Sequence, residues 1–172
     1  PVYSAARTKV RFAVMVRAGS ALSALEMIQG GVTTVADMYY FETEVADVIE
    51  VSGMRGIVGQ TLADFTAPDH TTFDEGFALC EDLVAHCAGK ARLIASIAPH
   101  APYSTGMDVL ERVAAWHDRN RDTRIQIHLA ETEPERTWAR DTHDMTTVAV
   151  SEKAGVLRPG TIAAHCLLLE DA

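Results

Sequence analysis

Five short runs of apolar and β-branched residues recur along the chain and limit what it can fold into. They begin at residues 32, 56, 92, 124 and 161, so successive starts lie 24 to 37 residues apart. Glycine, proline or charged residues bound each run, as is typical of a strand buried on both faces of a parallel sheet. We predict strands at residues 32–38, 56–62, 92–98, 124–130 and 161–166.

Helical patterns fill the segments between these runs, with apolar residues at a spacing of about 3.6. Gly30-Gly31 gives a stop signal for one helix, and Thr71-Thr72 can cap the start of another. The last segment fits one interrupted helix or two helices with a break around residues 141–144. We predict helices at residues 5–29, 42–51, 73–87, 106–120 and 133–154. Strands that alternate with helices in this way predict an α/β fold with a parallel sheet.

Two α/β folds share this rhythm, the doubly wound sheet and the (β/α)8 barrel, and the histidines distinguish them. His100, His128 and His165 lie at or near the ends of three successive predicted strands. In a barrel, the carboxyl ends of all strands converge on one mouth, where functional residues gather. A doubly wound nucleotide binder would carry a glycine-rich turn after its first strand, and neither GxGxxG nor GxxxxGK[ST] occurs here. We therefore predict a (β/α)8 TIM barrel.

Composition excludes several classes of protein. The chain has 172 residues, 48% of them hydrophobic, which argues against a disordered protein. A formal charge of −9 argues against a nucleic-acid partner, and the lack of an apolar run of about 18 residues argues against a membrane partner. Three cysteines are too few for a disulfide framework, and no signal peptide precedes the first helix. We expect reduced thiols and a cytoplasmic protein.

The segment from His128 to Glu131 is the most informative about chemistry. The side chains of Gln126 and His128 face the same side of a strand, and Glu131 follows just beyond the strand end. A neutral imidazole suits a zinc-like cation, and a nearby carboxylate could move protons between a metal-bound water and a substrate nitrogen. The alternative is a buried, hydrogen-bonded histidine beside a glutamate that merely begins a helix.

His165 and His100 carry two further hypotheses. Small alanines flank His165, so it could ligate a metal or orient an attacking water; alternatively, it is a core histidine bonded to a carbonyl. Two prolines stiffen the turn around His100, which could hold it against a substrate; alternatively, it is an exposed loop histidine. We interpret the remaining histidines as surface or structural residues, and we favour a structural role for Asp37. These histidines are His70, His86, His117 and His143.

Four motifs, in order along the chain, resemble the amidohydrolase superfamily. They are GVTTVADMYYF at residues 31–41, APHAPYS at 98–104, IHLAETEPE at 127–135 and AAHC at 163–166. Within the superfamily they are most similar to the aminohydrolase branch that includes 5′-methylthioadenosine/S-adenosylhomocysteine deaminases, with chlorohydrolases and guanine deaminases close by.

The resemblance implies a metal-dependent hydrolase on a (β/α)8 barrel, with zinc or alternatively iron. Such an enzyme deaminates a purine-like or other nitrogen heteroaromatic ring by the attack of a metal-bound hydroxide. By the resemblance, His128 is a metal ligand, Glu131 is the catalytic proton shuttle and His165 holds the attacking water. His100 contacts the small-molecule substrate.

Departures from the family pattern limit what this stretch of chain can do. It has no His-x-His pair and no match to the metal-binding Asp of the eighth strand, and Gln60 stands where adenosine-type deaminases commonly place an arginine. We therefore expect residues 1–172 to be the central portion of one barrel domain, with strands two to six. Open sheet edges then predict self-association, and so a homo-oligomer. The alternatives are an inactive fragment or non-catalytic α/β domain, and a chlorohydrolase or amide-ring hydrolase of the same superfamily.

Overall fold

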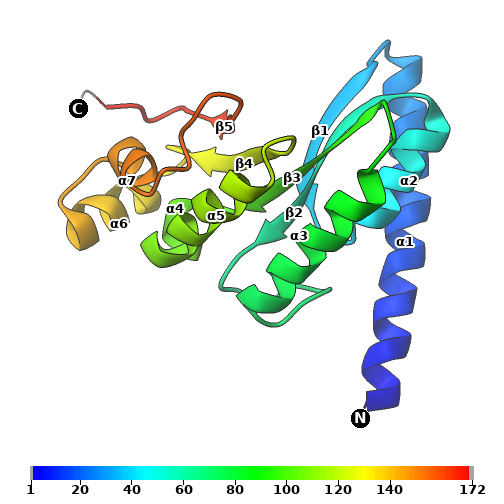
Figure 1. The fold of residues 1–172 in the computed structure, drawn as a ribbon, viewed down its shortest axis with the longest axis horizontal. Coiled ribbons are helices and arrows are strands. Elements are labelled where there is room, and N and C mark those ends of the chain that lie inside the picture. The colour runs from blue at the N-terminus through cyan, green and yellow to red at the C-terminus, as the bar shows by residue number, and fades with distance from the viewer. Residues whose placement is uncertain (1, 171–172) are drawn as a thin grey trace. The chain divides into compact units, whose positions relative to one another are not determined.

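The computed structural model describes the backbone of residues 2–170 and side chains from residue 10 onward. Helices and strands alternate along the chain, as the sequence predicts (Figure 1). The strands are β1 (Thr34–Tyr39), β2 (Arg55–Leu62), β3 (Leu93–Pro99), β4 (Arg124–Leu129) and β5 (Ile162–His165). The helices are α1 (Val2–Gln29), α2 (Glu42–Ser52), α3 (Phe73–Cys87), α4 (Pro102–Thr105), α5 (Met107–Arg119), α6 (Glu133–His143) and α7 (Thr147–Lys153).

The strands follow one another in the sheet in the order β1-β2-β3-β4-β5, which is their order along the chain. Pairing is parallel, with Thr34 opposite Arg55 between β1 and β2, and Gln126 opposite Ile162 between β4 and β5. A doubly wound sheet reverses its strand order at a switch point, whereas a barrel keeps chain order. The predicted fold class is confirmed.

The chain divides into two compact units. The first comprises Pro1–Gln60 and Thr66–Ser96, and the second comprises Thr61–Phe65 and Ile97–Ala172. In the first unit α1 packs against α2 (Figure 1). Arg17 on α1 forms ion pairs with Glu44 at 2.9 Å and with Asp47 at 3.2 Å. Apolar side chains of α2, α3 and the strands form its core, among them Val45, Ile49, Val58, Leu83 and Leu93.

The second unit contains the carboxyl end of β3, strands β4 and β5, and helices α4 to α7. Buried side chains follow one another along β4, as in a strand covered on both faces, and recur at helical spacing on α5. Ile125 and Ile127 are almost fully buried on β4, as are Leu110 and Val113 on α5. Each such side chain removes apolar surface from water, which stabilises the fold by about 1.5–3 kcal/mol relative to exposure.

Local signals account for where the helices begin and end. Thr72 caps α3 by accepting a hydrogen bond from the Glu75 N–H at 3.2 Å, as the sequence predicts. The break in the last helical segment falls at Asp144, whose left-handed φ of 53° ends α6, so the two-helix alternative is correct. The single turn α4, directly after His100, was not predicted as helix. Its first residue is Pro102. Proline suits this position because it has no N–H, and the N–H of the first helical residue has no partner inside the helix in any case.

The three cysteines are free thiols, in agreement with the prediction. Cys80 and Cys87 are buried on α3, and burial raises the pKa of Cys87 to about 11. None of the helices within residues 2–170 is long and apolar enough to cross a membrane.

Candidate functional site

The three predicted strand-end histidines lie together in the second unit. The ring centroids of His100 and His128 are 4.9 Å apart, and those of His128 and His165 are 5.2 Å apart. The supporting residues come from the ends of β3, β4 and β5, which is the convergence that the barrel hypothesis requires. The structure therefore brings these residues together, while their chemical roles stay predictions.

The His128 ring is held through a backbone carbonyl. Its Nδ1 lies 2.8 Å from the carbonyl oxygen of His100, and the same oxygen accepts the His128 backbone N–H at 3.0 Å. Because a carbonyl can only accept, Nδ1 must carry the ring proton. The electron pair of His128 is then on Nε2, the arrangement that a metal-ligating histidine needs.

Glu131 follows a sharp turn at the end of β4. Ala130 has a left-handed φ of 51°, and the chain turns there before α6 begins. The Glu131 Oε1 atom lies 3.5 Å from Nε2 of His165. This distance is longer than a good hydrogen bond, so a small rearrangement or one bridging atom would couple the two groups.

Glu135 holds this turn, and the sequence analysis missed it. Its side chain is 1% exposed, and its two oxygens accept the backbone N–H groups of Ala130 and Glu131, each at 2.9 Å. In return Thr132 Oγ1 caps the Glu135 N–H at 3.4 Å. The pattern Thr-x-x-Glu is a capping box that could have been found in the sequence. Glu135 therefore fixes both amides beside the candidate proton shuttle.

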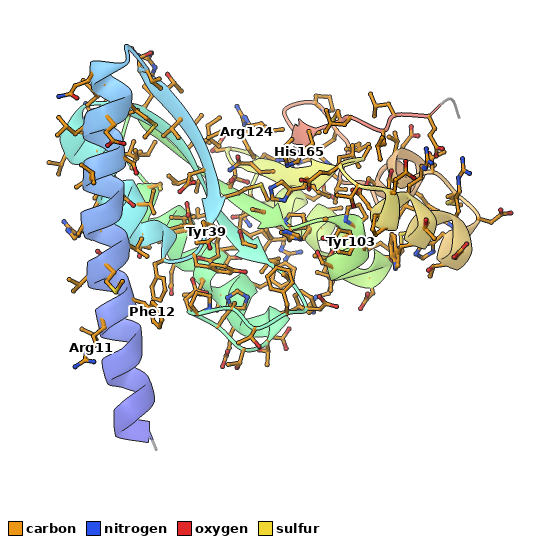
Figure 2. The ribbon with its side chains drawn as sticks, turned by 180° about the vertical axis from the view of Figure 1, so that it is seen from behind. Arg11, Phe12, Tyr39, Tyr103, Arg124 and His165 are labelled. Carbon is orange, nitrogen blue, oxygen red and sulfur yellow. The ribbon has the colours of Figure 1, made fainter. Side chains whose placement is uncertain are left out.

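His165 ends β5 in an unusual backbone conformation. His165 and Cys166 both have positive φ, 72° and 53°, in a region that non-glycine residues seldom occupy. The turn is held because the Cys166 N–H donates to the Leu129 carbonyl at 2.9 Å. Figure 2 shows the His165 side chain at the end of this strand. Such conformations cost about 1–3 kcal/mol each and cluster at functional sites.

His100 sits among aromatic rings and one serine. Phe65 and Tyr103 meet its ring edge-on, with centroids 5.1 Å and 6.1 Å away, and both are partly exposed. Nδ1 of His100 lies 2.7 Å from the hydroxyl of Ser104, which is 3% exposed. Partial burial, and then the nearby His128 ring, lower the pKa of His100. The environment therefore favours the neutral form of the His100 imidazole, which is packed against two aromatic rings.

Gln60 and His70, which belong to the first unit, form a separate buried cluster around Asp69. Asp69 accepts hydrogen bonds from Gln60 at 3.1 Å and from the Phe41 N–H at 2.9 Å, and it lies 2.7 Å from His70. Burial acts to raise the pKa of Asp69, but these bonds lower it overall. His70 is 2% exposed, so it is a structural residue and not a surface one.

The other histidines also have local roles. His86 on α3 lies 2.8 Å from Asp47, within the first unit. His117 on α5 is buried and donates from Nε2 to the Thr123 carbonyl at 3.3 Å. Asp37 hydrogen-bonds to the buried Glu42 at the start of α2. The structural interpretation of these residues agrees with the structure.

The donors present fit a divalent metal in part. His128 is held in the tautomer that offers Nε2, and His165 and Glu131 lie beside it. Within residues 2–170, no group of three or more His, Cys, Asp and Glu side chains is arranged to hold a metal ion. A tightly bound zinc needs three or four protein ligands. Alone, these residues would therefore fill only part of a zinc coordination shell.

Comparison with known proteins places this arrangement in a family. The sequence pattern of the amidohydrolase family matches residues 14–172. The chain belongs to the amidohydrolase family. It is 35% identical over 156 residues to a 5′-deoxyadenosine deaminase of Methanothermobacter thermautotrophicus, a match that covers 90% of this chain and 36% of the relative.

Two further relatives agree. A 5-methylthioadenosine/S-adenosylhomocysteine deaminase of Syntrophobacter fumaroxidans is 35% identical over 153 residues, covering 89% of this chain and 35% of the relative. The crystal structure of an adenosine deaminase from Xanthomonas campestris with bound zinc superposes with a TM-score of 0.87 at 28% identity, covering 92% of this chain and 36% of that one. This amidohydrolase chain thus spans about a third of the length of these relatives.

Proposed function

We propose that this chain is the central portion of an aminohydrolase barrel that removes an amino group from a purine-like or other nitrogen heteroaromatic ring by hydrolysis. The observation that carries the proposal is the juxtaposition of His128, His165 and Glu131 at the ends of neighbouring strands. The relatives named above, all called deaminases, support the reaction class.

In this proposal each residue has a separate task. His128 would help to hold a divalent metal, most simply zinc, through Nε2. When bound, such a metal supplies Lewis acidity that makes water acidic enough to act near neutral pH. His165 orients the attacking water by a hydrogen bond, and Glu131 takes its proton and passes it to the leaving amine. His100 contacts the ring of the substrate.

The position of Glu131 supports its role. General acid–base catalysis needs a group within about 2.6–3.2 Å of the proton that it moves, or one water away. Glu131 Oε1 is 3.5 Å from His165 Nε2, so a water held by His165 would lie within reach of the carboxylate. Glu135 fixes the backbone of this turn by accepting hydrogen bonds from the N–H groups of Ala130 and Glu131.

Turnover measurements test the proposal. The full-length gene product, loaded with Zn²⁺, is assayed for ammonia release from adenosine, guanine, pterin and triazine compounds. Glu131→Gln should abolish turnover while metal content is unchanged, because only the proton acceptor is lost. Glu133→Gln is the matched control, since the Glu133 side chain is 60% exposed and pairs with Arg136 at 2.6 Å. No turnover of any compound by the metal-loaded protein would sink the deaminase proposal.

The second candidate is a chain without catalytic activity of its own. One observation favours it: within the described part of the chain, no group of three or more His, Cys, Asp or Glu side chains could hold a metal ion. We expect the 172-residue chain alone to bind zinc weakly, because two imidazoles make an incomplete ligand set. Elemental analysis after dialysis measures this. Stoichiometric, tightly held zinc would contradict the incomplete-site interpretation.

We also propose self-association and a cytoplasmic location. Strands β1 and β5 are the terminal strands of the sheet order, and unpaired edges of this kind recruit other strands. The three free thiols suit a reducing compartment. Size-exclusion chromatography with light scattering measures the oligomeric state, and a clean monomer would count against association.

A further inference from the structure

His100 and His128 are neighbours with different hydrogen-bond partners. The Nδ1 atom of His128 faces a carbonyl, which fixes its proton on Nδ1. The Nδ1 atom of His100 faces the Ser104 hydroxyl, which can either donate or accept. The proton position on His100 therefore depends on where the Ser104 hydroxyl directs its own proton.

The Ala101 carbonyl is the competing acceptor for that proton. Three donors lie within hydrogen-bonding distance of it: the Thr105 hydroxyl at 2.8 Å, and the backbone N–H and the hydroxyl of Ser104, each at 3.2 Å. A carbonyl oxygen has two lone pairs, so three donors compete for them. Nδ1 of His100 is the less crowded acceptor for the Ser104 hydroxyl.

The distances lead to the same assignment. Oγ of Ser104 is 2.7 Å from His100 Nδ1 but 3.2 Å from the Ala101 oxygen. Hydroxyl donors make hydrogen bonds of about 2.7–2.8 Å, whereas N–H donors prefer about 2.9–3.0 Å. The 2.7 Å contact lies in the range of hydroxyl donors, and we assign it to donation from Ser104 Oγ to Nδ1 of His100.

We propose that Ser104 is a positioning residue that fixes His100 with its proton on Nε2, so that His100 presents a hydrogen-bond donor to the substrate. The adjacent His128 instead presents an electron pair on its own Nε2 atom. Two histidines with rings 4.9 Å apart thereby carry opposite tautomers.

The substrate part of this inference rests on the proposed function. A donor on His100 recognises an acceptor atom, which in a heteroaromatic substrate is an unprotonated ring nitrogen or an oxygen. The aromatic rings of Phe65 and Tyr103, edge-on to His100, would leave that ring little freedom to rotate. The tautomer itself is a property of the chain and needs neither metal nor substrate.

Nitrogen-15 NMR of the labelled 172-residue chain tests the tautomers directly. Two-bond correlations between ring nitrogens and ring protons show which nitrogen carries the proton, at a pH where imidazole is neutral and with a chelator present. The His100 signals are assigned by their loss in His100→Gln. We expect the proton on Nε2 in His100 and on Nδ1 in His128.

The variant Ser104→Ala should shift the His100 signals toward a mixture of tautomers and leave those of His128 unchanged. Ser151→Ala is the matched control, because Ser151 is also fully buried and donates to a backbone carbonyl, that of Thr147, at 2.9 Å. It should move neither histidine.

A proton on Nδ1 of His100 in the wild-type chain would overturn the proposal, as would an unchanged His100 tautomer in Ser104→Ala. The wild-type spectrum decides the tautomer even if Ser104→Ala fails to fold. If the spectrum is as expected but the metal-loaded full-length protein turns over none of the compounds, the substrate part and the deaminase proposal are refuted and the tautomer assignment stands.

Discussion

Glu42 and Glu135 occupy similar places in the two units and behave differently. Each lies in the first turn of a helix that follows a strand, and each is 1% exposed. Glu135 accepts backbone N–H groups at both oxygens. Glu42 accepts the Gly59 N–H at 3.0 Å and hydrogen-bonds to a second acid, Asp37.

The surroundings decide the chemistry of each carboxyl group. Burial, and then the charge of Asp37, raise the pKa of Glu42 well above its usual value. The raised pKa favours the protonated form of Glu42 inside the first unit, while Glu135 accepts hydrogen bonds that fix a turn. Equal burial does not give equal function, because Glu42 lies beside a second acid, Asp37, whose charge also raises its pKa.

The largest expected effect is that of Glu135→Ala. It leaves the N–H groups of Ala130 and Glu131 without the carboxylate that binds them, at about 1–3 kcal/mol for each group, so the free energy of unfolding should fall by about 2–6 kcal/mol. Urea unfolding measures the loss. Glu133→Ala serves as the control, because its exposed ion pair with Arg136 contributes about 1 kcal/mol or less. Equal losses in both variants would contradict the role given to Glu135.

Glutamine substitutions compare the two sites directly. Glu135→Gln should cost about 1–3 kcal/mol, since the amide NH₂ meets a backbone donor where the carboxyl group offered an acceptor. Glu42→Gln should change the free energy of unfolding by about 0.5 kcal/mol or less, because a neutral amide replaces a neutral acid of the same shape. A smaller loss of unfolding free energy in Glu135→Gln than in Glu42→Gln would contradict the roles given to the two carboxyl groups.

The pH dependence of stability sharpens the Glu42 half of the comparison. In the unfolded chain Glu42 ionises above about pH 4.3, whereas in the folded chain burial and then Asp37 raise its pKa. The folded state therefore binds more protons above this pH, so stability falls as the pH rises from about 4.3 to the folded pKa of Glu42. Glu42→Gln should flatten this fall, measured by unfolding at about pH 5 and about pH 7. A slope as steep as that of the wild type would show that Glu42 is ionised in the fold.

The smallest effect concerns the turn that Glu135 holds. Ala130 has φ 51°, a conformation that costs an L-residue about 1–2 kcal/mol, so Ala130→Gly should stabilise the chain by about 0.5 kcal/mol after the entropy of glycine is deducted. Thermal unfolding measures it. The exposed Ala115 on α5 gives the opposite control, because Ala115→Gly should destabilise its helix by about 1 kcal/mol. A loss of stability in Ala130→Gly would show that the left-handed turn carries no strain.

The sequence predicted the elements well because their signals are local. All five strands and the break near Asp144 follow from runs of apolar residues, glycine stops and polar caps. The clustering of His100, His128 and His165 was also predictable, since parallel strands place their carboxyl ends on one side.

Other features depend on contacts that no local pattern encodes. The pairing of Asp37 with Glu42 requires the fold to be known, and so does the contact between Ser104 and the His100 ring. Glu135 is intermediate: its capping-box signal is visible in the sequence, but its bonds to both amides around Glu131 are not.

The carbonyl of residue 100 has a consequence for how this site can change over time. The His128 ring is oriented by the main chain of residue 100 and not by its side chain. A different side chain at residue 100 would keep the same carbonyl, so it could alter what the pocket recognises without releasing His128. Under the proposed function, mutation could therefore vary the group that faces the substrate while the orientation of His128 is kept, and saturation mutagenesis at residue 100 is a rational route to new specificity.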